Sequence, residues 1–162
     1  MKRIILFLFI IFSVYIFISL YFLDKTYFLC PIEYKDAIII RNDAWGDGFF
    51  SAKRSGGRVH DGIDLLAEVG TPVSAARSGI VVKATQSKGM GKFVIIRHPG
   101  NLTTIYGHLS EIYVHKNEFV RQGRLIGRVG KTGNANLGAI QAHLHLEVRI
   151  NGIPHDPMEY LE

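Results

Sequence analysis

Cysteine is almost absent from this chain of 162 residues, which contains only Cys30. A single cysteine excludes an internal disulfide. The residues just before it are Tyr27-Phe28-Leu29, whereas the cysteine that is modified in bacterial lipoproteins normally follows a small residue. We therefore expect Cys30 to keep an unmodified thiol.

The sequence also lacks a basic run with interleaved aromatic residues. Lys and Arg number 19 against 14 Asp and Glu, which gives a formal net charge of +5. Without a basic, aromatic-rich stretch, nucleic acid is not an expected partner. Scattered basic residues are typical of a solvated surface, and they would also suit an anionic envelope polymer or a membrane surface. No internal repeat or low-complexity segment is visible, and the length suits one domain.

Charge is absent from residues 4–23, a stretch that follows Lys2 and Arg3. Twenty such residues rise about 30 Å as a helix, which matches the hydrocarbon core of a bilayer. No small-residue cleavage motif follows. We therefore expect an uncleaved transmembrane signal anchor at residues 1–23, which crosses the cytoplasmic membrane through residues 4–23. Lys2 and Arg3 would stay in the cytoplasm, and the remaining domain would be exported.

The composition changes twice after this segment. Residues 24–40 are expected to form a short juxtamembrane segment. Turn and loop signals then fill residues 41–57, including Gly46-Asp47-Gly48 and Ser55-Gly56-Gly57. We expect this loop to form one wall of a binding groove, at the start of a domain that covers residues 41–162.

Long helical periodicity is absent after residue 24, and short β-branched segments are present instead. Turn residues separate them at intervals of roughly 8–12 positions, which is typical of an all-β sandwich or barrel. The fold class is therefore predicted to be all-β, an antiparallel, sandwich-like or barrel-like domain after one N-terminal transmembrane helix. The expected strands cover residues 71–75, 79–84, 92–97, 102–108, 125–129 and 142–150.

A pair of histidines is the most informative motif. From Ala142 to Arg149 apolar and polar residues alternate strictly, which is typical of a half-buried strand. His143 and His145 therefore project from the same face of a rigid element, side by side. Proteins present nitrogen ligands to a metal ion in this way.

A second element supplies a complement, because His60 and Asp64 are four residues apart in a loop that contains Gly62 and leads into an apolar run. Two nitrogens and one carboxylate oxygen would give Zn²⁺ three protein ligands and leave a fourth tetrahedral position for water. This arrangement favours a catalytic zinc site. The pattern alone does not distinguish His143 from His145.

Other polar residues allow two interpretations each. His108 follows a β-branched run, where it is either an exposed strand-end histidine or an imidazole that supports the metal ligands or takes part in catalysis near neutral pH. Glu147 is either a general base or, as we favour, the ion-pair partner of Arg149 or of a loop arginine. Trp45 either faces substrate or, as we favour, anchors its loop. The remaining histidines are expected to be surface or turn residues: His98, His115 and His155.

Several ordered motifs carry a family resemblance. They are His60-x-Gly-Ile-Asp64, Gly70-Thr-Pro-Val-x-Ala75, Tyr106-x-His-Leu-Ser110, Gly130-x-Thr-Gly133 and His143-x-His-x-Glu147. Together they resemble the M23 (lysostaphin-type, LytM-like) zinc metallopeptidases of bacterial cell walls. The resemblance covers residues 41–160, nearly the whole expected domain.

The resemblance implies a role for each matching histidine and carboxylate. His60, Asp64 and His145 would bind one Zn²⁺ per chain. His143 would lie beside the metal and would, with His108, transfer protons and steady the developing oxyanion.

The implied function is that of a zinc metalloendopeptidase that cuts peptidoglycan stem peptides or cross-bridges. It would sit in the bacterial cytoplasmic membrane with its catalytic domain on the periplasmic or extracellular side. One alternative is a non-catalytic wall-binding or hydrolase-activator module of the same fold, and another is an enzyme that cuts a glycine-rich protein.

Two features differ from the usual family pattern. The segment 133–141 is longer than usual, which bears on the peptide that is cut. Arg54 and Arg58 stand where some members carry a tyrosine, and either would hold a carbonyl or a stem-peptide carboxylate through charge-assisted hydrogen bonds.

Overall fold

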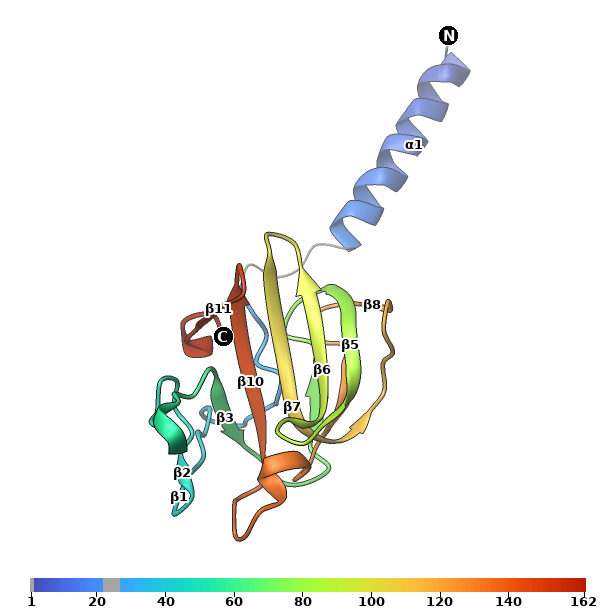
Figure 1. Ribbon diagram of the computed structural model, residues 1–162. Coiled ribbons are helices and arrows are strands. Elements are labelled where there is room, and N and C mark those ends of the chain that lie inside the picture. The colour runs from blue at the N-terminus through green and yellow to red at the C-terminus, as the bar shows by residue number, and fades with distance from the viewer. Residues whose placement is uncertain (1, 22–26) are drawn as a thin grey trace.

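The chain forms one N-terminal helix and a mostly β domain (Figure 1). The computed structural model describes residues 2–21 and 27–162, without the side chains of residues 17–21. Three short 3-10 turns, η1 to η3, accompany the strands. The elements are α1 (Lys2–Tyr21), β1 (Asn42–Asp43), β2 (Gly46–Asp47), η1 (Ser55–Gly57), β3 (Ile63–Leu66), β4 (Pro72–Ser74), β5 (Gly79–Ser87), β6 (Gly91–His98), β7 (Leu102–Ile112), β8 (Phe119–Val120), β9 (Leu125–Val129), η2 (Gly133–Asn136), β10 (His143–Ile150), β11 (Ile153–His155) and η3 (Pro157–Glu159).

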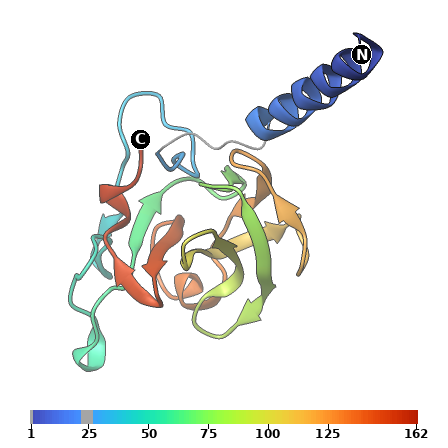
Figure 2. The same cartoon turned by 90° about the horizontal axis from the view of Figure 1, so that it is seen from above.

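Nine of the strands in the described residues form one sheet, and every strand pair in it is antiparallel. The order β11-β10-β7-β6-β5-β8 gives its main path, while β3 also pairs with β10 and β9 joins β4 to β7. Figure 2 shows the strands curling around a common interior. The antiparallel all-β prediction is confirmed, and each of the six expected segments contains a strand.

The alternating side chains of strand β10 contribute to the core on one face and to the site on the other. Leu144, Leu146 and Val148 are fully buried on one face of β10, which is the apolar half of the predicted alternation. On the other face His143 and His145 are also buried. The prediction of a half-buried strand is therefore only half right, because the segment before β3 covers the polar face.

Helix α1 does not pack into this core. Its large apolar side chains between Ile4 and Ile16 are exposed, and the helix projects away from the sheet (Figure 1). Within the described residues, no helix is long and apolar enough to span a bilayer. The predicted anchor at residues 1–23 includes residues 1, 22 and 23, which lie outside the described part of the chain, as do residues 24–26 of the juxtamembrane segment.

The rest of the segment before the domain is packed against it. Phe28 and Ile32 are buried in the core cluster. The Phe28 amide donates to the carbonyl of Tyr160 at 3.1 Å, and the Glu162 amide donates to the carbonyl of Phe28 at 3.1 Å. Backbone hydrogen bonds therefore join the described start of this segment to the last residues of the sequence.

One histidine prediction is wrong. His98 was expected at the surface, but it is only 4% exposed, and its ring contacts the Ser78 carbonyl at 2.9 Å and Thr104 Oγ1 at 2.8 Å. The physical reason is parity, because His98 shares a strand face with the buried Val94 and Ile96. As predicted, the side chain of His115 is exposed, whereas His155 is half-buried in β11.

Candidate metal centre

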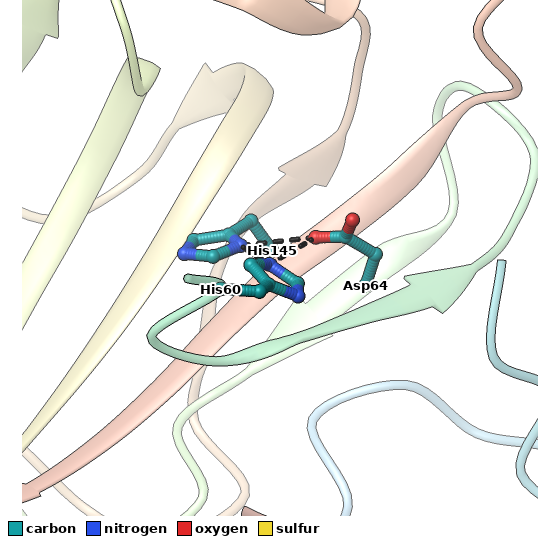
Figure 3. A group of neighbouring side chains, drawn as sticks. All are labelled: His60, Asp64 and His145. Atoms are coloured by element: carbon teal, nitrogen blue, oxygen red, sulfur yellow. Dashed lines mark hydrogen bonds and ion pairs between the residues drawn. The ribbon is translucent and has the colours of Figure 1, made fainter. Parts of the chain in front are cut away.

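Three predicted residues converge on one point although they come from different parts of the chain. His60 lies in the loop before β3, Asp64 is in β3, and His145 is in β10, directly opposite Asp64 in the strand register. His60 Nε2 is 3.0 Å from His145 Nδ1 and 3.1 Å from Asp64 Oδ1. His145 Nδ1 is 3.0 Å from the same oxygen. Figure 3 shows the three side chains pointing at one another, and this buried group could hold a metal ion.

The hydrogen-bond partners of the two rings fix which nitrogens face inward with a lone pair. His60 Nδ1 lies 2.9 Å from the carbonyl oxygen of Phe49, so it carries the ring proton. His145 Nε2 lies 3.0 Å from Glu147 Oε1, so it also carries a proton. The opposite nitrogens and Asp64 Oδ1 therefore face one another as three potential donor atoms for one cation. In the metal-free protein a proton between His145 and Asp64 supplies the positive charge.

The spacing fits a tetrahedral metal. Bonds of about 2.0–2.1 Å at tetrahedral angles place neighbouring donor atoms about 3.3 Å apart, close to the separations between His60, Asp64 and His145. Two imidazoles and one carboxylate are also a donor set that Zn²⁺ accepts with a fourth position left open. The residues present therefore fit a divalent metal ion.

The electrostatics of the site agree with this geometry. Burial opposes the charged form of Asp64, but hydrogen bonds with His145 and His60 outweigh it and hold the pKa of this carboxyl well below its usual range. Burial would likewise lower the pKa of His145, yet its bonds to Asp64 and Glu147 raise that pKa to about 9. Both shifts favour a cation at the centre.

Two arginines hold the outer oxygen of the carboxylate. Asp64 Oδ2 accepts from Arg41 Nη2 at 3.0 Å and from Arg54 Nη2 at 3.4 Å. Oδ2 is therefore occupied, and only Oδ1 faces the histidines. Arg54, predicted to contact substrate, thus holds Asp64, while Arg58 lines the groove and donates to the Ser55 carbonyl at 3.3 Å.

Three backbone hydrogen bonds, called here the backbone net, hold the loop before β3 against the site. Arg41 donates its amide to the Asp64 carbonyl, Asp64 donates to the Gly48 carbonyl, and Gly48 donates to the Arg41 carbonyl, each at 2.8 Å. A Cβ on Gly48 would lie 2.6 Å from the Arg41 carbonyl oxygen and 2.9 Å from Asp64 Cβ. Only glycine allows this close approach without displacing the metal-site carboxylate.

His143 and His108 lie beside the centre with free ring nitrogens. His143 Nδ1 donates to the Gln141 carbonyl at 2.7 Å, and its Nε2 is 3.8 Å from Asp64 Oδ1. His108 Nδ1 donates to the Thr132 carbonyl at 2.9 Å, and the centres of the His108 and His143 rings are 4.9 Å apart. The backbone of His108 has a φ of 62°, a left-handed conformation that is unusual inside a strand such as β7.

Burial favours the neutral form of both of these rings. Burial, followed by the charges of His143 and His145, lowers the pKa of His108 to about 3. Burial also lowers the pKa of His143, despite the opposing effect of Asp64. Each ring therefore offers a lone pair that can accept a proton close to the metal position.

Glu147 forms the ion pair that the sequence predicted. Its Oε2 accepts from Arg149 Nε at 2.6 Å, and Arg149 Nη2 continues to Asp61 at 2.8 Å. Its other oxygen contacts His145 Nε2 at 3.0 Å, which the sequence did not reveal. Glu147 therefore orients the ring of His145, as outer carboxylates do for metal-binding histidines.

The site opens into a groove of about 350 Å³. All five predicted site residues, His60, Asp64, His108, His143 and His145, line this groove, and the segment 41–57 contributes the expected wall with Arg41, Trp45 and Arg54. Trp45 is 56% exposed. A Cβ on Gly138 would lie 2.4 Å from its ring, so the ring packs against the backbone there. This contact agrees with the anchor interpretation of Trp45.

Residues that the sequence analysis missed are Arg41, Asp43 and Gln141. Arg41 is only 4% exposed, although arginine is rarely buried without a partner. Arg41 and Asp43 lie in the segment 41–57, which was predicted only to be a loop that forms one wall of a groove. No spacing rule connects these positions to the histidines.

The sequence model of Peptidase family M23 matches residues 58–157. The DD-carboxypeptidase/endopeptidase Mpg of Neisseria meningitidis is 42% identical over 101 residues, which cover 62% of this chain and 22% of that protein. The peptidoglycan DD-endopeptidase ShyC of Vibrio cholerae is 40% identical over 100 residues, again 62% of this chain and 22% of that protein. The similarity thus spans about a fifth of the length of these relatives.

A solved structure, a zinc-containing peptidase from Vibrio cholerae, has a similar fold. Its TM-score is 0.68 at 30% sequence identity, over 83% of this chain and 40% of that protein. Because the family match covers more than half of the sequence and includes the three converging side chains, this chain belongs to peptidase family M23.

Proposed function

We propose that this protein is a zinc metalloendopeptidase that hydrolyses peptide bonds in peptidoglycan stem peptides or cross-bridges. One observation carries the proposal: His60 Nε2, Asp64 Oδ1 and His145 Nδ1 come together as three potential metal-donor atoms at one point beside an open groove. Relatives named as peptidoglycan endopeptidases support the choice of substrate.

The residues His60, Asp64 and His145 would hold the zinc ion. When bound, Zn²⁺ supplies Lewis acidity toward the scissile carbonyl and makes the attacking water more acidic. Arg41 and Arg54 keep the second oxygen of Asp64 occupied, so this carboxylate contributes one oxygen. Glu147 keeps the proton of His145 on Nε2, away from the metal.

His143 and His108 would transfer protons. Each ring donates its Nδ1 proton to a backbone carbonyl, so Nε2 is the nitrogen that reacts. One ring accepts the proton of the attacking water, and the carbon–nitrogen bond of the peptide breaks as a proton is delivered to the leaving amine. A ring that has gained a proton also becomes a donor that can stabilise negative charge on the carbonyl oxygen.

The groove favours a peptide substrate with a carboxylate. Arg58 lines the groove close to His60, and its guanidinium contacts the Ser55 carbonyl through Nε. The remaining nitrogens would bind a stem-peptide carboxylate through charge-assisted hydrogen bonds. The loop 133–141 borders the same groove through Asn134, Ala135 and Ile140, and in this proposal it would select the peptide.

We further propose that residues 1–23 anchor the enzyme in the cytoplasmic membrane and that residues 41–162 act on its outer side. Support comes from the uncharged run at residues 4–23 after Lys2 and Arg3 and from the exposed apolar side chains of α1. Reporter fusions at the two ends of the chain would test this orientation.

Digestion of defined peptidoglycan by the purified full chain tests the activity. We expect shortened stem peptides or opened cross-bridges by mass spectrometry, loss of these products after chelation, and their return on addition of Zn²⁺. Full activity after chelation would exclude the zinc mechanism. A purified protein that neither binds zinc nor cuts the wall would instead support a non-catalytic wall-binding module.

A further inference from the structure

An ion pair outside the family-matched region lies between the metal-binding carboxylate and the proton-transferring histidine. Arg41 donates through Nη2 to Asp64 Oδ2 at 3.0 Å and through Nη1 to Asp43 Oδ1 at 2.7 Å. The side chains of Arg41 and Asp43 are 5% and 11% exposed. Both residues precede the matched range, which begins at residue 58.

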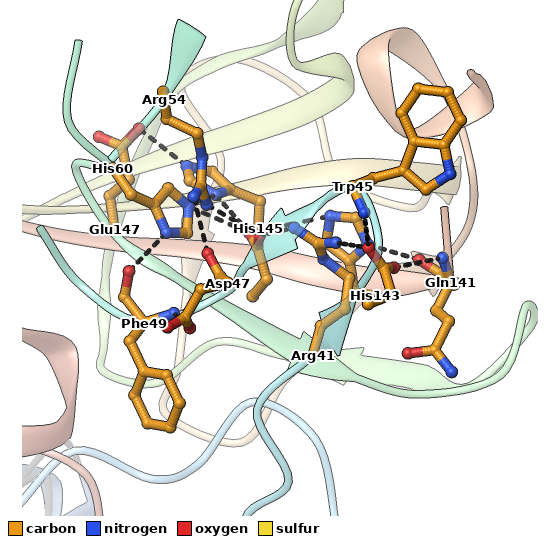
Figure 4. Close-up of polar contacts among 12 residues, drawn as sticks. Arg41, Trp45, Asp47, Phe49, Arg54, His60, Gln141, His143, His145 and Glu147 are labelled. Carbon is orange, nitrogen blue, oxygen red and sulfur yellow. Dashed lines mark hydrogen bonds and ion pairs between the residues drawn. The ribbon is translucent and has the colours of Figure 1, made fainter. Parts of the chain in front are cut away.

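The same ion pair reaches His143 from the other side. Asp43 Oδ2 accepts the backbone amide of Gln141 at 3.0 Å, although the two residues are 98 positions apart in the chain. The carbonyl of Gln141 in turn accepts the Nδ1 proton of His143 at 2.7 Å. Figure 4 shows Arg41 beside His143, with Gln141 and Trp45 next to them. Two side chains, Arg41 and Asp43, and the backbone of Gln141 therefore connect Asp64 to His143.

The hairpin of β1 and β2 makes a second contact with the loop that carries Gln141. The Trp45 amide donates to Asp43 Oδ1 at 2.8 Å, and the Trp45 ring packs against Gly138. The hairpin thus holds the loop 133–141 at two points, one polar and one apolar. That loop leads directly into β10, whose first residue is His143.

Burying the charged side chain of Arg41 costs desolvation free energy, and a gain in folding stability does not account for its burial. Its Nε is buried without a hydrogen-bond partner among the described residues. Buried ion pairs contribute little net stability, and an unpaired buried donor is unfavourable. Buried polar groups without a hydrogen-bond partner are exceptions in native proteins.

We propose that Arg41 and Asp43 are positioning residues that couple the metal ligand to the proton carrier. Arg41 holds the outer oxygen of Asp64, so that the inner oxygen stays aimed at the metal. Asp43 accepts the backbone amide of Gln141 and so holds this residue in place. The carbonyl of Gln141 then keeps the proton of His143 on Nδ1 and leaves Nε2 free. The effect on turnover depends on the proposed peptidase function, whereas the effect on metal binding does not.

Two conservative variants test the coupling in the full chain. Arg41→Lys keeps the positive charge but cannot span Asp64 and Asp43 with two fixed nitrogens. Asp43→Asn keeps the shape of the side chain. It replaces one of the two acceptor oxygens with an NH2 group, which cannot accept a hydrogen bond from the donor that it faces. Asp47→Asn is the matched control, because it removes a charge from the same hairpin while keeping the acceptor for the Phe49 amide.

The readouts are the zinc dissociation constant from chelator competition and the separate values of kcat and KM. Replacing partners of metal-binding residues weakens metal affinity or activity about 10–100-fold. We expect a rise of that size in the zinc dissociation constant for Arg41→Lys. For Asp43→Asn we expect a fall of that size in kcat with little change in KM. Asp47→Asn should match the wild type in all three quantities.

The outcomes separate this inference from the proposed function. Weaker zinc binding by Arg41→Lys in a protein without peptidase activity would support the positioning role of Arg41 and reject the peptidase. Wild-type zinc affinity in Arg41→Lys, together with wild-type kcat in Asp43→Asn, would overturn the inference. If Arg41→Lys fails to fold by circular dichroism, the kcat and KM of Asp43→Asn decide the question.

Discussion

Asp64 lies directly opposite His145 in the antiparallel register of β3 and β10, with Oδ1 of the aspartate 3.0 Å from Nδ1 of the histidine. Two rigid, paired strands therefore set the distance between these two side chains. Only His60 reaches the same point from a loop, and its Nδ1 is tied to the Phe49 carbonyl at 2.9 Å. The site is thus largely preformed by the sheet, and its response to substitution can be predicted residue by residue.

Replacing His145 should abolish both metal binding and activity. His145→Ala removes one of three facing lone-pair donors, and the remaining two offer Zn²⁺ too few protein ligands for a catalytic site. Metal content of the purified protein, measured by mass spectrometry, and peptidoglycan digestion are the assays. His115→Ala is the control, because the side chain of His115 is 82% exposed. Zinc retained at one ion per chain in His145→Ala would contradict the assigned ligand set.

Replacing His143 should separate metal binding from catalysis. His143→Ala leaves His60, Asp64 and His145 in place, so zinc content should stay at one ion per chain. Loss of a general acid or base typically lowers the rate about 10²–10⁴-fold, and we expect a fall in kcat within that range. Equal loss of zinc and activity would instead identify His143 as a ligand.

The metal-free protein should be most stable near pH 6.5. The pKa of His145 is about 9 in the fold against 6.5 for the free side chain. The stabilisation by this group is therefore fully present below pH 6.5 and is lost as the pH rises through 9. Its size is on the order of 3 kcal/mol. The pKa of His108 is lowered to about 3, so its contribution is present above pH 6.5 and is lost as the pH falls toward 3.

Urea unfolding at pH 6.5 and pH 9, with chelator and with added zinc, measures this effect. Zinc takes the place of the proton on His145, so the loss of stability between the two pH values should largely disappear in the zinc-loaded protein. Chelated protein that is as stable at pH 9 as at pH 6.5 would show that His145 carries no extra proton in the metal-free fold.

Strand alternation and local spacing pointed to His60, Asp64 and the histidine pair in residues 142–149. The role of His108, and the choice of His145 as the ligand of that pair, came from the family resemblance. Alternation in residues 142–149 places His143 and His145 on one face, and the structure shows this arrangement. The same rule would have identified His98 as a core residue, since it shares parity with Val94 and Ile96. His98 is followed directly by Pro99 and Gly100, two residues typical of turns, and this favoured a turn position over the strand pattern.

The contacts of Arg41 and Asp43 could not be predicted in the same way. Asp43 accepts a hydrogen bond from the backbone amide of Gln141. Every residue except proline has such an amide, so the residue type at position 141 does not reveal the contact. Arg41 meets Asp64 only because the segment before β3 folds back across the sheet. Such contacts depend on tertiary packing between distant segments, which spacing along one strand does not encode.

Gly48 gives the sharpest test of how the segment before β3 supports the site. In Gly48→Ala the new Cβ would lie 2.6 Å from the Arg41 carbonyl oxygen and 2.9 Å from Asp64 Cβ. Backbone atoms cannot move as a flexible side chain does, so the variant must displace Arg41, Asp64 or both. We expect a lower unfolding midpoint and at least about tenfold weaker zinc binding, as for the loss of a partner of a metal ligand. Gly89→Ala is the control for stability, because the nearest atom to its new Cβ would be a side-chain nitrogen of Asn134 at 3.8 Å. If Gly48→Ala binds zinc as tightly as the wild type, the backbone net around Gly48 does not position Asp64, because a shift of the carboxylate by even a few tenths of an ångström should weaken metal binding.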